Sequence, residues 1–269
     1  FFWGDNDGGE NQQVDSNDSS LWDYRIDLNG THSNGLVSNF LTGLQKNTQY
    51  YYRLFGGNSV SSAVWSLPSQ EGLSSWWTLD ESGGPQAFDS LGIRHATLVG
   101  VAESDRVFGR VGRAIKLSGS GEHVTVKGYK GIGGQNPRSL AMWIKAPTSF
   151  ASGTLVSWGA AGDGQGWNFS VHNGRLKIDV GGGELTGGTI VNDDAWHHVA
   201  LVFDGTQRLF YVDGTPAGGG ASIRSTPMPF GGSAIGNTIS PNPSYAFAGD
   251  VDELSLYTAA LSAAEISAI

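Results

Sequence analysis

The sequence contains no cysteine, which excludes disulfides, thiolate metal sites and cysteine nucleophiles. No apolar run approaches the roughly 20 residues that a membrane-spanning helix needs. No charged segment followed by an apolar stretch opens the chain, as it would in a secretory signal peptide. We therefore expect no insertion into a membrane, and we expect a fold that its hydrophobic core stabilises without covalent cross-links.

Positive charge is also scarce. The chain has 16 Lys and Arg against 25 Asp and Glu, for a formal net charge of −9. Such a surface repels a phosphate backbone, and no stretch clusters Lys or Arg among aromatic residues as a nucleic-acid groove would. The sequence therefore argues against a nucleic-acid partner.

Glycine and aromatic residues are abundant instead, with Gly 41, Trp 9, Tyr 8 and Phe 12. Aromatic residues favour strands, and glycine favours the tight turns that join them. At 269 residues the chain is long enough for two domains. We predict an all-β protein with a small first β-sandwich and a larger second one.

The first domain is predicted over residues 1–66. Its strand-like runs are Phe1–Trp3, Tyr24–Leu28, Leu36–Leu41, Tyr50–Phe55 and Ala63–Trp65. The stretch Leu44–Arg53, with its Tyr50-Tyr51-Tyr52, resembles the E-F corner and F strand of fibronectin type III domains. Nothing before Phe1 supplies the first strand of a complete module. The resemblance therefore implies a partial domain that is either truncated or completed by an upstream partner.

A linker is predicted over residues 67–72, where Pro68 and Gly72 interrupt the strand pattern. The second domain then spans residues 73–269. Asn173-Gly174 predicts a hairpin between two alternating runs, because both residues tolerate the positive φ of a type I′ turn. Asp204–Gln207 and Asp213-Gly214 predict the next two turns. One helix is expected at Ser262–Ile269, where Ser262 and Glu265 have capping-box spacing.

Several pieces of this half occur in a characteristic order. They are Trp77–Glu81, Phe88–Gly92, Gly112–Gly119, Trp196–Ala200, Tyr211–Gly214 and Phe247–Tyr257, followed by Leu261-Ser262 and Glu265-Ile266. Together they resemble the laminin-G-like, concanavalin A-like jelly-roll family. The resemblance implies two facing antiparallel sheets whose first and last strands lie side by side. It therefore places Asp80 near Asp252.

The last strand contains a break in its pattern, since Val251 occupies an odd position and Leu254 and Leu256 occupy even ones. A bulge at Asp252-Glu253 would resolve the break and re-aim a side chain. Asp252, Asp80 and a carbonyl of Gly119 would then offer the oxygen ligands that Ca²⁺ prefers. The resembled family often holds a structural calcium there. In the alternative, Asp252 accepts backbone N–H bonds and Asp80 ends a strand, with no ion present.

Four aromatic residues are candidates for binding a ligand, because they lie in or beside loops rich in glycine or proline. They are Tyr129, Trp158, Trp167 and Tyr245. A flat ring there can stack on a sugar, although each ring can instead pack in the core. His197 and His198 are adjacent in a predicted strand, so they point to opposite faces and cannot chelate one ion together.

Catalytic motifs are missing. The sequence has no Gly-x-Ser-x-Gly elbow, no His-Glu-x-x-His and no phosphate-binding loop. It also lacks the Glu-x-Asp-x-x-Glu arrangement of jelly-roll glycosidases. We therefore predict a non-catalytic binding or adhesion module, secreted or at the cell surface, that recognises glycan or an extracellular protein.

Two alternatives stay open. An incomplete first sandwich exposes strand edges, through which copies of the chain can self-associate into a fibre or surface assembly. The chain can also be an ancillary domain of a larger secreted glycosidase or protease.

Overall fold

The computed structural model describes residues 2–4, 24–25, 49–56, 59–66, 72–159, 165–181, 183–221, 233–235 and 243–269. The chain forms two compact units, one of residues 1–70 with 268–269 and one of residues 71–267. Residues 67–71 of the predicted linker lie outside the described residues.

The first unit contains a four-stranded sheet in the order β2-β1-β3-β4. Its strands are β1 (Phe2–Gly4), β2 (Tyr24–Arg25), β3 (Gln49–Gly56) and β4 (Ser59–Ser66). β3 and β4 form a regular antiparallel hairpin from Gln49 opposite Ser66 to Gly56 opposite Ser59. The predicted strand Leu36–Leu41 lies outside the described residues, and the likeness to a fibronectin type III domain stays a prediction.

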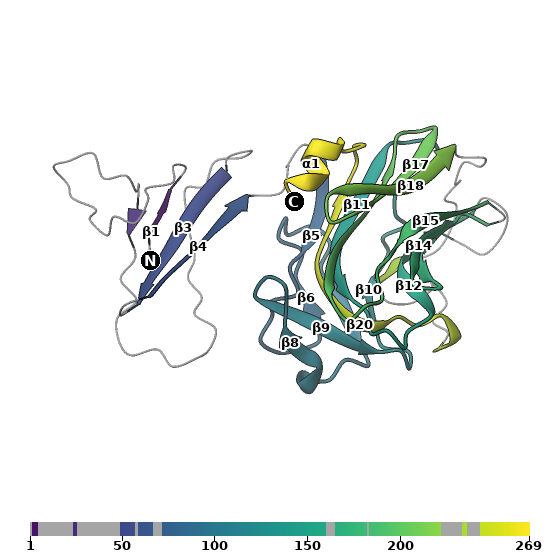
Figure 1. Ribbon diagram of the computed structural model, residues 1–269. Helices are drawn as coiled ribbons and strands as arrows, with labels where there is room; N and C mark the ends of the chain where they lie inside the picture. The colour runs from purple at the N-terminus through teal and green to yellow at the C-terminus, as the bar shows by residue number, and fades with distance from the viewer. Residues whose placement is uncertain are drawn as a thin grey trace. The chain divides into compact units, whose positions relative to one another are not determined.

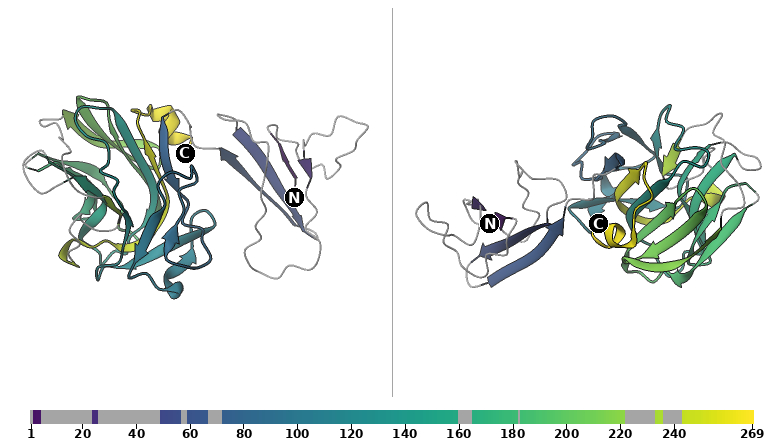
Figure 2. Two further views of the ribbon diagram at one scale, coloured as in Figure 1. Left: turned by 180° about the vertical axis from the view of Figure 1, so that it is seen from behind. Right: turned by 90° about the horizontal axis from the view of Figure 1, so that it is seen from above.

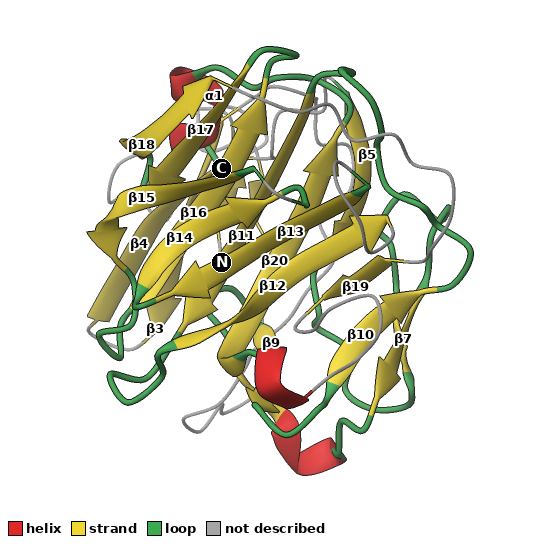
Figure 3. Cartoon of the chain, turned by 90° about the vertical axis from the view of Figure 1, so that its right-hand side faces the viewer, coloured by secondary structure: helices red, strands yellow, loops and turns green. Residues whose placement is uncertain are grey.

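The second unit consists of two antiparallel sheets packed face to face (Figures 1 and 2). We call the sheet that faces the viewer in Figure 3 the front sheet and the other the back sheet. In spatial order the front sheet contains β15 (Glu184–Ile190), β14 (Arg175–Asp179), β13 (Gly166–His172), β12 (Ser152–Gly159), β19 (Ser233–Ile235), β10 (His123–Val126), β7 (Ala96–Val99) and β6 (Gln86–Ala87). This is the predicted jelly-roll β-sandwich.

The back sheet is built around the C-terminal strand of the chain. In spatial order it contains β18 (Thr215–Ala221), β17 (Gln207–Val212), β16 (Trp196–Phe203), β11 (Arg138–Lys145), β20 (Ala248–Tyr257), β9 (Arg113–Ser118) and β8 (Arg106–Phe108). β5 (Leu73–Trp77) also pairs with β20, with Leu254 opposite Trp77. The predicted contact between the first and last strands of this unit is confirmed.

The predicted hairpins are present. Asn173 (φ 50°) and Gly174 (φ 72°) join β13 to β14, and Asp213 (φ 50°) and Gly214 (φ 72°) join β17 to β18. Two successive positive φ angles define a type I′ turn, whose twist matches that of the flanking strands. Residues 204–206 join β16 to β17, also as expected.

Three short helical segments complete the second unit. They are the 3₁₀ turns η1 (Glu103–Asp105) and η2 (Pro243–Tyr245) and the helix α1 (Ala263–Ser267). The predicted capping box is present at α1, because Ser262 N–H donates to Glu265 Oε2 at 2.7 Å and Glu265 N–H donates to Ser262 Oγ at 3.3 Å. Among the described residues, no helix has both the length and the apolar character needed to cross a membrane.

The core lies between the two sheets. Strands β13 and β14 alternate strictly, so that Phe169, Val171 and Ile178 point inward while the residues between them face outward. The back sheet contributes Leu201, Phe210 and other apolar side chains to the same cluster. The core therefore lies between the sheets along the length of the strands, and the turns join the strands at its two ends.

Candidate functional site

A β-bulge shapes the middle of β20. Asp252 lies opposite Trp143, whereas Ser255 lies opposite Ala141, so β20 has one more residue than β11 across this interval. Glu253 takes up the irregularity with φ 52°. Val251 and Leu254 can consequently both face the core, and the bulge that the sequence predicts at Asp252-Glu253 is confirmed.

Asp252 is completely buried beneath the turn between β8 and β9. Its Oδ2 accepts N–H bonds from Arg110 at 2.8 Å and from Val111 at 3.0 Å. A Cβ at Gly109 would lie 2.5 Å from the same oxygen, so the close approach of this turn requires glycine. Asp252 Oδ1 is buried without a hydrogen-bond partner, which is a costly state for a carboxylate oxygen.

Two further carboxyl groups belong to the same site. Asp80 follows β5, and its Oδ1 accepts the N–H of Arg113 at 2.6 Å. Glu253 accepts the indole N–H of Trp76 at 2.6 Å. The first and last strands of the unit thus bring together residues more than 170 positions apart, with Trp76 bonded across that separation.

The pKa values of all three carboxyl groups are raised, chiefly by burial. Burial raises the pKa of Asp252 to about 7, and the negative charge of Asp80 adds to the shift, while the backbone N–H groups of Val111, Arg110 and Glu253 oppose it. Burial raises the pKa of Glu253 to about 8, again with a contribution from the charge of Asp252. Burial also raises the pKa of Asp80. A cation at this place would stabilise the ionised forms.

The donor set fits a hard cation only in part. In the described part of the chain, no three His, Cys, Asp or Glu side chains are grouped so that they could hold a metal ion together. The unpartnered Asp252 Oδ1 nevertheless offers a buried oxygen beside Asp80, and Ca²⁺ accepts backbone carbonyls and water as further ligands. This orphaned oxygen is the observation that fits a cation.

The predicted contribution of Gly119 to the site is wrong. In the pairing of β20 with β9, Ala248 lies opposite Ser118, and a Cβ at Gly119 would touch the side chain of Ala248. Asp252 lies four residues further along β20, which at about 3.3 Å per residue is roughly 13 Å away. The turn Gly109–Gly112 takes the place that the sequence assigned to Gly119. Gly109 and Gly112 mark this turn in the sequence, because a Cβ at Gly109 would clash with Asp252 and one at Gly112 would clash with Asp80.

Two of the aromatic candidates are core residues. Trp158 and Trp167 lie opposite each other on β12 and β13, and each is 1% exposed. Their rings stack in parallel with centroids 5.4 Å apart, and both belong to the core cluster; Trp167 is inward in the alternation of β13, and Trp158 lies directly opposite it. The prediction that these rings stack on a ligand is therefore wrong.

The other two aromatic candidates reach solvent from different loops. Tyr245 in η2 is 55% exposed. Tyr129 is half-buried, and with Trp77 and Trp158 it lines an apolar cavity of about 20 Å³, too small for a ligand larger than water. The guanidinium carbon of Arg94 lies 4.6 Å from the centroid of the Tyr129 ring. Tyr129 and Tyr245 remain predictions as ligand contacts.

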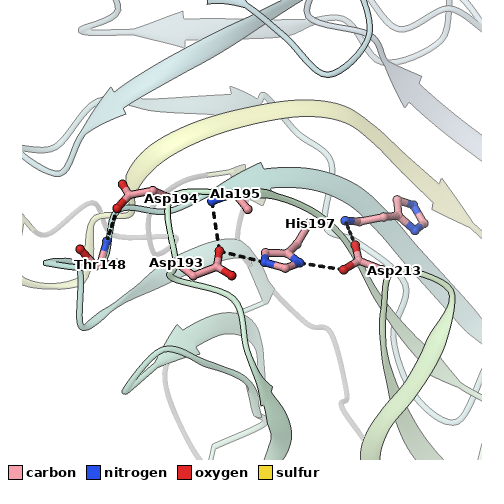
Figure 4. A network of polar contacts seen from close by, with 7 residues as sticks. Thr148, Asp193, Asp194, Ala195, His197 and Asp213 are labelled. Atoms are coloured by element: carbon pink, nitrogen blue, oxygen red, sulfur yellow. Dashed lines mark hydrogen bonds and ion pairs between the residues drawn. The ribbon is translucent and has the colours of Figure 1, made fainter.

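The two adjacent histidines have separate environments. His197 bonds to Asp213 Oδ2 through Nδ1 at 2.8 Å and to Asp193 Oδ1 through Nε2 at 3.0 Å (Figure 4). Burial lowers the pKa of His197, but the two carboxylates outweigh that effect and the pKa is raised. Burial lowers the pKa of His198 to about 4, and its ring lies 5.2 Å from that of Trp143. Neither arrangement is a chelating pair.

Comparison with known proteins identifies the family to which the second unit is similar. The family model described as the concanavalin A-like lectin/glucanases superfamily matches residues 118–267. Among curated proteins, the sushi, von Willebrand factor type A, EGF and pentraxin domain-containing protein 1 of Rattus norvegicus is 25% identical over 142 residues. That match covers 49% of this chain and 4% of the relative, so the chain corresponds to a small part of that protein.

Solved structures show the same fold. Domain 4 of AbnA, an extracellular arabinanase from Geobacillus stearothermophilus solved with arabinotriose, matches with a TM-score of 0.57 and 19% identity, over 72% of this chain and 96% of that domain. The binding domain of Paraclostridial Mosquitocidal Protein 1 matches with a TM-score of 0.57 and 17% identity, over 73% of this chain and 51% of that one. At these identities the likeness establishes the fold.

Proposed function

Because the chain belongs to the concanavalin A-like lectin/glucanases superfamily, we propose that it is an extracellular module that binds glycan chains without cleaving them and that holds a structural calcium ion. The observation that carries this proposal is the similar domain of the arabinanase, which was solved with arabinotriose. That domain matches along almost its whole length, so a complete glycan-binding unit of this architecture is the relevant comparison.

The calcium proposal is supported by the group of Asp80, Asp252 and Glu253, which we call the carboxyl site. Asp252 Oδ1 is buried without a partner, and Asp80 and Glu253 add negative charge around it. Bound calcium would supply positive charge at this place. Asp80 and Asp252 would hold it, with carbonyl oxygens of the neighbouring backbone. Because Asp252 also accepts the N–H groups of the β8–β9 turn, the ion would fix this turn against β20.

The proposal that binding occurs without catalysis rests on the chemistry of the same site. Asp252 and Asp80 are engaged by backbone N–H groups, and Glu253 is engaged by the indole of Trp76. These bonds fix the carboxyl groups as parts of the fold, whereas a general acid or base must reach a substrate atom.

A second candidate function is that of an ancillary domain in a larger secreted glycosidase. It is favoured by the same comparison, since the matching structure is one domain of an extracellular arabinanase. Recognition of a protein surface and self-association through open strand edges stay predictions.

A glycan array probed with the full chain tests the proposed function, with calorimetric titration of each hit in calcium and in chelator. We expect binding to one class of glycan and no release of reducing sugar from it. Absence of binding to every glycan would contradict the proposal, and hydrolysis of a bound glycan by the purified chain would contradict its non-catalytic part.

A further inference from the structure

Two connections between the front and back sheets lie together at one end of the second unit. One joins β11 to β12, and the other, residues 191–195, joins β15 to β16. We call residues 191–195 the crossover loop. Asp194 N–H donates to the carbonyl oxygen of Ala146 at 3.0 Å, and Asn192 Nδ2 donates to that of Phe150 at 2.7 Å. These bonds fasten the two connections to each other.

His197, the second residue of β16, joins the crossover loop to the turn between β17 and β18 (Figure 4). Its Nε2 lies 3.0 Å from Asp193 Oδ1, and its Nδ1 lies 2.8 Å from Asp213 Oδ2. Asp193 belongs to the crossover loop and Asp213 to the turn. The His197 side chain is only 14% exposed, whereas the two carboxylates are half exposed. Each ring nitrogen therefore faces a carboxylate from a different segment.

These two bonds require two protons on the imidazole ring. An ionised carboxylate can only accept a hydrogen bond, and a neutral imidazole has one N–H group and one lone pair. The imidazolium can therefore donate to Asp193 and Asp213 together. The neutral ring can donate to one of them and turns its lone pair toward the other. Loss of a single proton thus converts one attractive contact into a repulsive one.

The titratable groups around His197 contribute unequally to its charge state. They are Asp193 and Asp194 of the crossover loop, Asp213 of the turn, His198 on the same strand and Lys145 on the neighbouring strand β11. Burial lowers the pKa of His197, but Asp213 and Asp193 outweigh that effect and the pKa is raised. Asp194 Oδ2 accepts the N–H of Thr148 at 3.4 Å. Burial lowers the pKa of His198 to about 4, so His198 is neutral where His197 titrates. The charge of Lys145 acts on Asp250.

The direction of the pH effect follows from the raised pKa of His197. The fold favours the protonated ring, so its contribution is fully present below the ordinary pKa of 6.5 and is lost as the pH rises through the folded-state pKa. The two bonds of His197 therefore hold this end of the sandwich together at acidic pH and weaken toward alkaline pH.

The two carboxylates differ in what else holds them. Asp213 Oδ1 accepts the N–H of His198 at 2.9 Å, and Asp213 N–H donates to the carbonyl oxygen of His198 at 2.8 Å. Asp193 Oδ1 accepts the N–H of Ala195, which belongs to the same loop. The turn is thus anchored to β16 independently of His197, so the crossover loop is the segment that a neutral ring releases.

We propose that His197 is a pH-operated clamp between the crossover loop and the turn that joins β17 to β18. As imidazolium it binds Asp193 and Asp213 together, and as neutral imidazole it keeps Asp213 through Nδ1 and releases Asp193. Because the crossover loop passes from the front sheet to the back sheet, the clamp sets how firmly the two sheets are joined at this end. The clamp uses no residue of the carboxyl site and requires neither a glycan nor calcium.

Nuclear magnetic resonance of the full chain labelled with ¹⁵N tests the clamp. Long-range correlation spectra should show protons on both ring nitrogens of His197 at pH 5. At pH 9 the ring should keep the proton on Nδ1 and lose the one on Nε2, because the bond to Asp213 selects that tautomer. Amide exchange, corrected for the intrinsic rate, should show that protection of Asp194 N–H falls about three- to tenfold, as expected for loss of a partly exposed charged bond. Protection of His198 N–H should stay constant.

Four variants control the measurement. His197→Gln should abolish the pH response of Asp194, whereas His172→Gln, which replaces an exposed histidine at the end of β13, should keep it. Asp193→Asn tests the clamp without removing the ring, and it should lower the pH at which His197 titrates. The carboxyl site titrates in the same range, so the response must persist in Asp252→Asn/Glu253→Gln.

Two results would overturn the clamp. One is a His197 ring that carries its proton on Nε2 and none on Nδ1 at pH 9. The other is a protection of Asp194 N–H that falls equally in the unaltered chain and in His197→Gln, because the response would then come from another group.

Discussion

At the scale of single residues, Asp252 is subject to opposing effects on its ionisation. It is completely buried, one carboxylate oxygen accepts two backbone N–H bonds, and the other oxygen has no partner. The two N–H bonds favour the ionised form, whereas burial and the charge of Asp80 disfavour it. Which form prevails depends on the pH and on whether a cation is present.

The variant Asp252→Asn tests the cost of this buried charge. In chelator at pH 8, we expect the substitution to raise the free energy of unfolding by about 1 to 3 kcal/mol, because the amide keeps an oxygen for the N–H bonds and removes the charge. Denaturant titration measures the change. Asp204→Asn is the control and should lower stability, because N–H bonds from Gln207 and Thr206 depress the pKa of Asp204. A loss of stability in both variants would show that Asp252 is not strained.

The pH dependence of the metal-free chain follows from the same shifts. The folded-state pKa values of Asp252 and Glu253, about 7 and about 8, lie above their ordinary values of 3.8 and 4.5. Raised values mean that the fold favours the protonated forms, so the contribution of these groups is fully present below pH 3.8 and is lost as the pH rises through 7 and 8. The raised pKa of His197 acts in the same direction.

Chemical denaturation between pH 5 and pH 9 in chelator should accordingly show a free energy of unfolding that decreases by several kcal/mol, because each group contributes about 1.4 kcal/mol per pH unit up to its folded-state pKa. The double variant Asp252→Asn/Glu253→Gln should flatten most of this slope, and His197→Gln should remove a smaller part. A free energy that rises over the same interval would have the wrong sign for raised carboxyl pKa values.

At the scale of elements, the sequence predicted the turns and the bulge, which depend on residues that are adjacent in the chain. The Asn173-Gly174 and Asp213-Gly214 turns follow from the backbone freedom of two adjacent residues, and both are type I′ turns. The bulge in β20 followed from the parity of Val251 against Leu254, because a regular strand cannot direct both inward. The contact between β5 and β20 was beyond local reasoning and came from the family resemblance.

The predictions that were wrong, for Gly119, Trp158 and Trp167, share one physical cause. The position and direction of a side chain in a sheet depend on the register between strands that are distant in the sequence. Gly119 was assigned to the site through its glycine-rich turn, but the register of β9 against β20 carries it to the other end of the pairing. Trp158 and Trp167 were selected for their neighbouring loops, but the alternation of β13 directs Trp167 inward, and the pairing of β12 with β13 places Trp158 opposite it in the core. A turn or a loop marks where a residue lies in the chain and leaves its direction undetermined.

The buried tryptophans lead to a prediction at the same scale. Trp167→Ala should lower the free energy of unfolding by about 3 to 5 kcal/mol, because it leaves a cavity between Trp158 and Phe203. Tyr245→Ala should leave stability nearly unchanged, since that side chain is more than half exposed. Thermal denaturation followed by circular dichroism distinguishes the two outcomes. Equal, small effects would place Trp167 at the surface.

At the scale of the whole molecule, the second unit is a sandwich in which the two ends of its own sequence meet. The carboxyl site joins β5 to β20 through the bond between Trp76 and Glu253 and through the pairing of the two strands. The four-stranded sheet of the first unit adds a second β body to the chain.

Calorimetric titration of Ca²⁺ into the metal-depleted full chain is the most direct measurement of whether the first and last strands of the second unit create a functional site. We expect saturable binding at one site, an increase in the melting temperature, and loss of both in Asp252→Asn. No heat of binding and identical melting curves with and without Ca²⁺ would contradict a calcium-stabilised binding module.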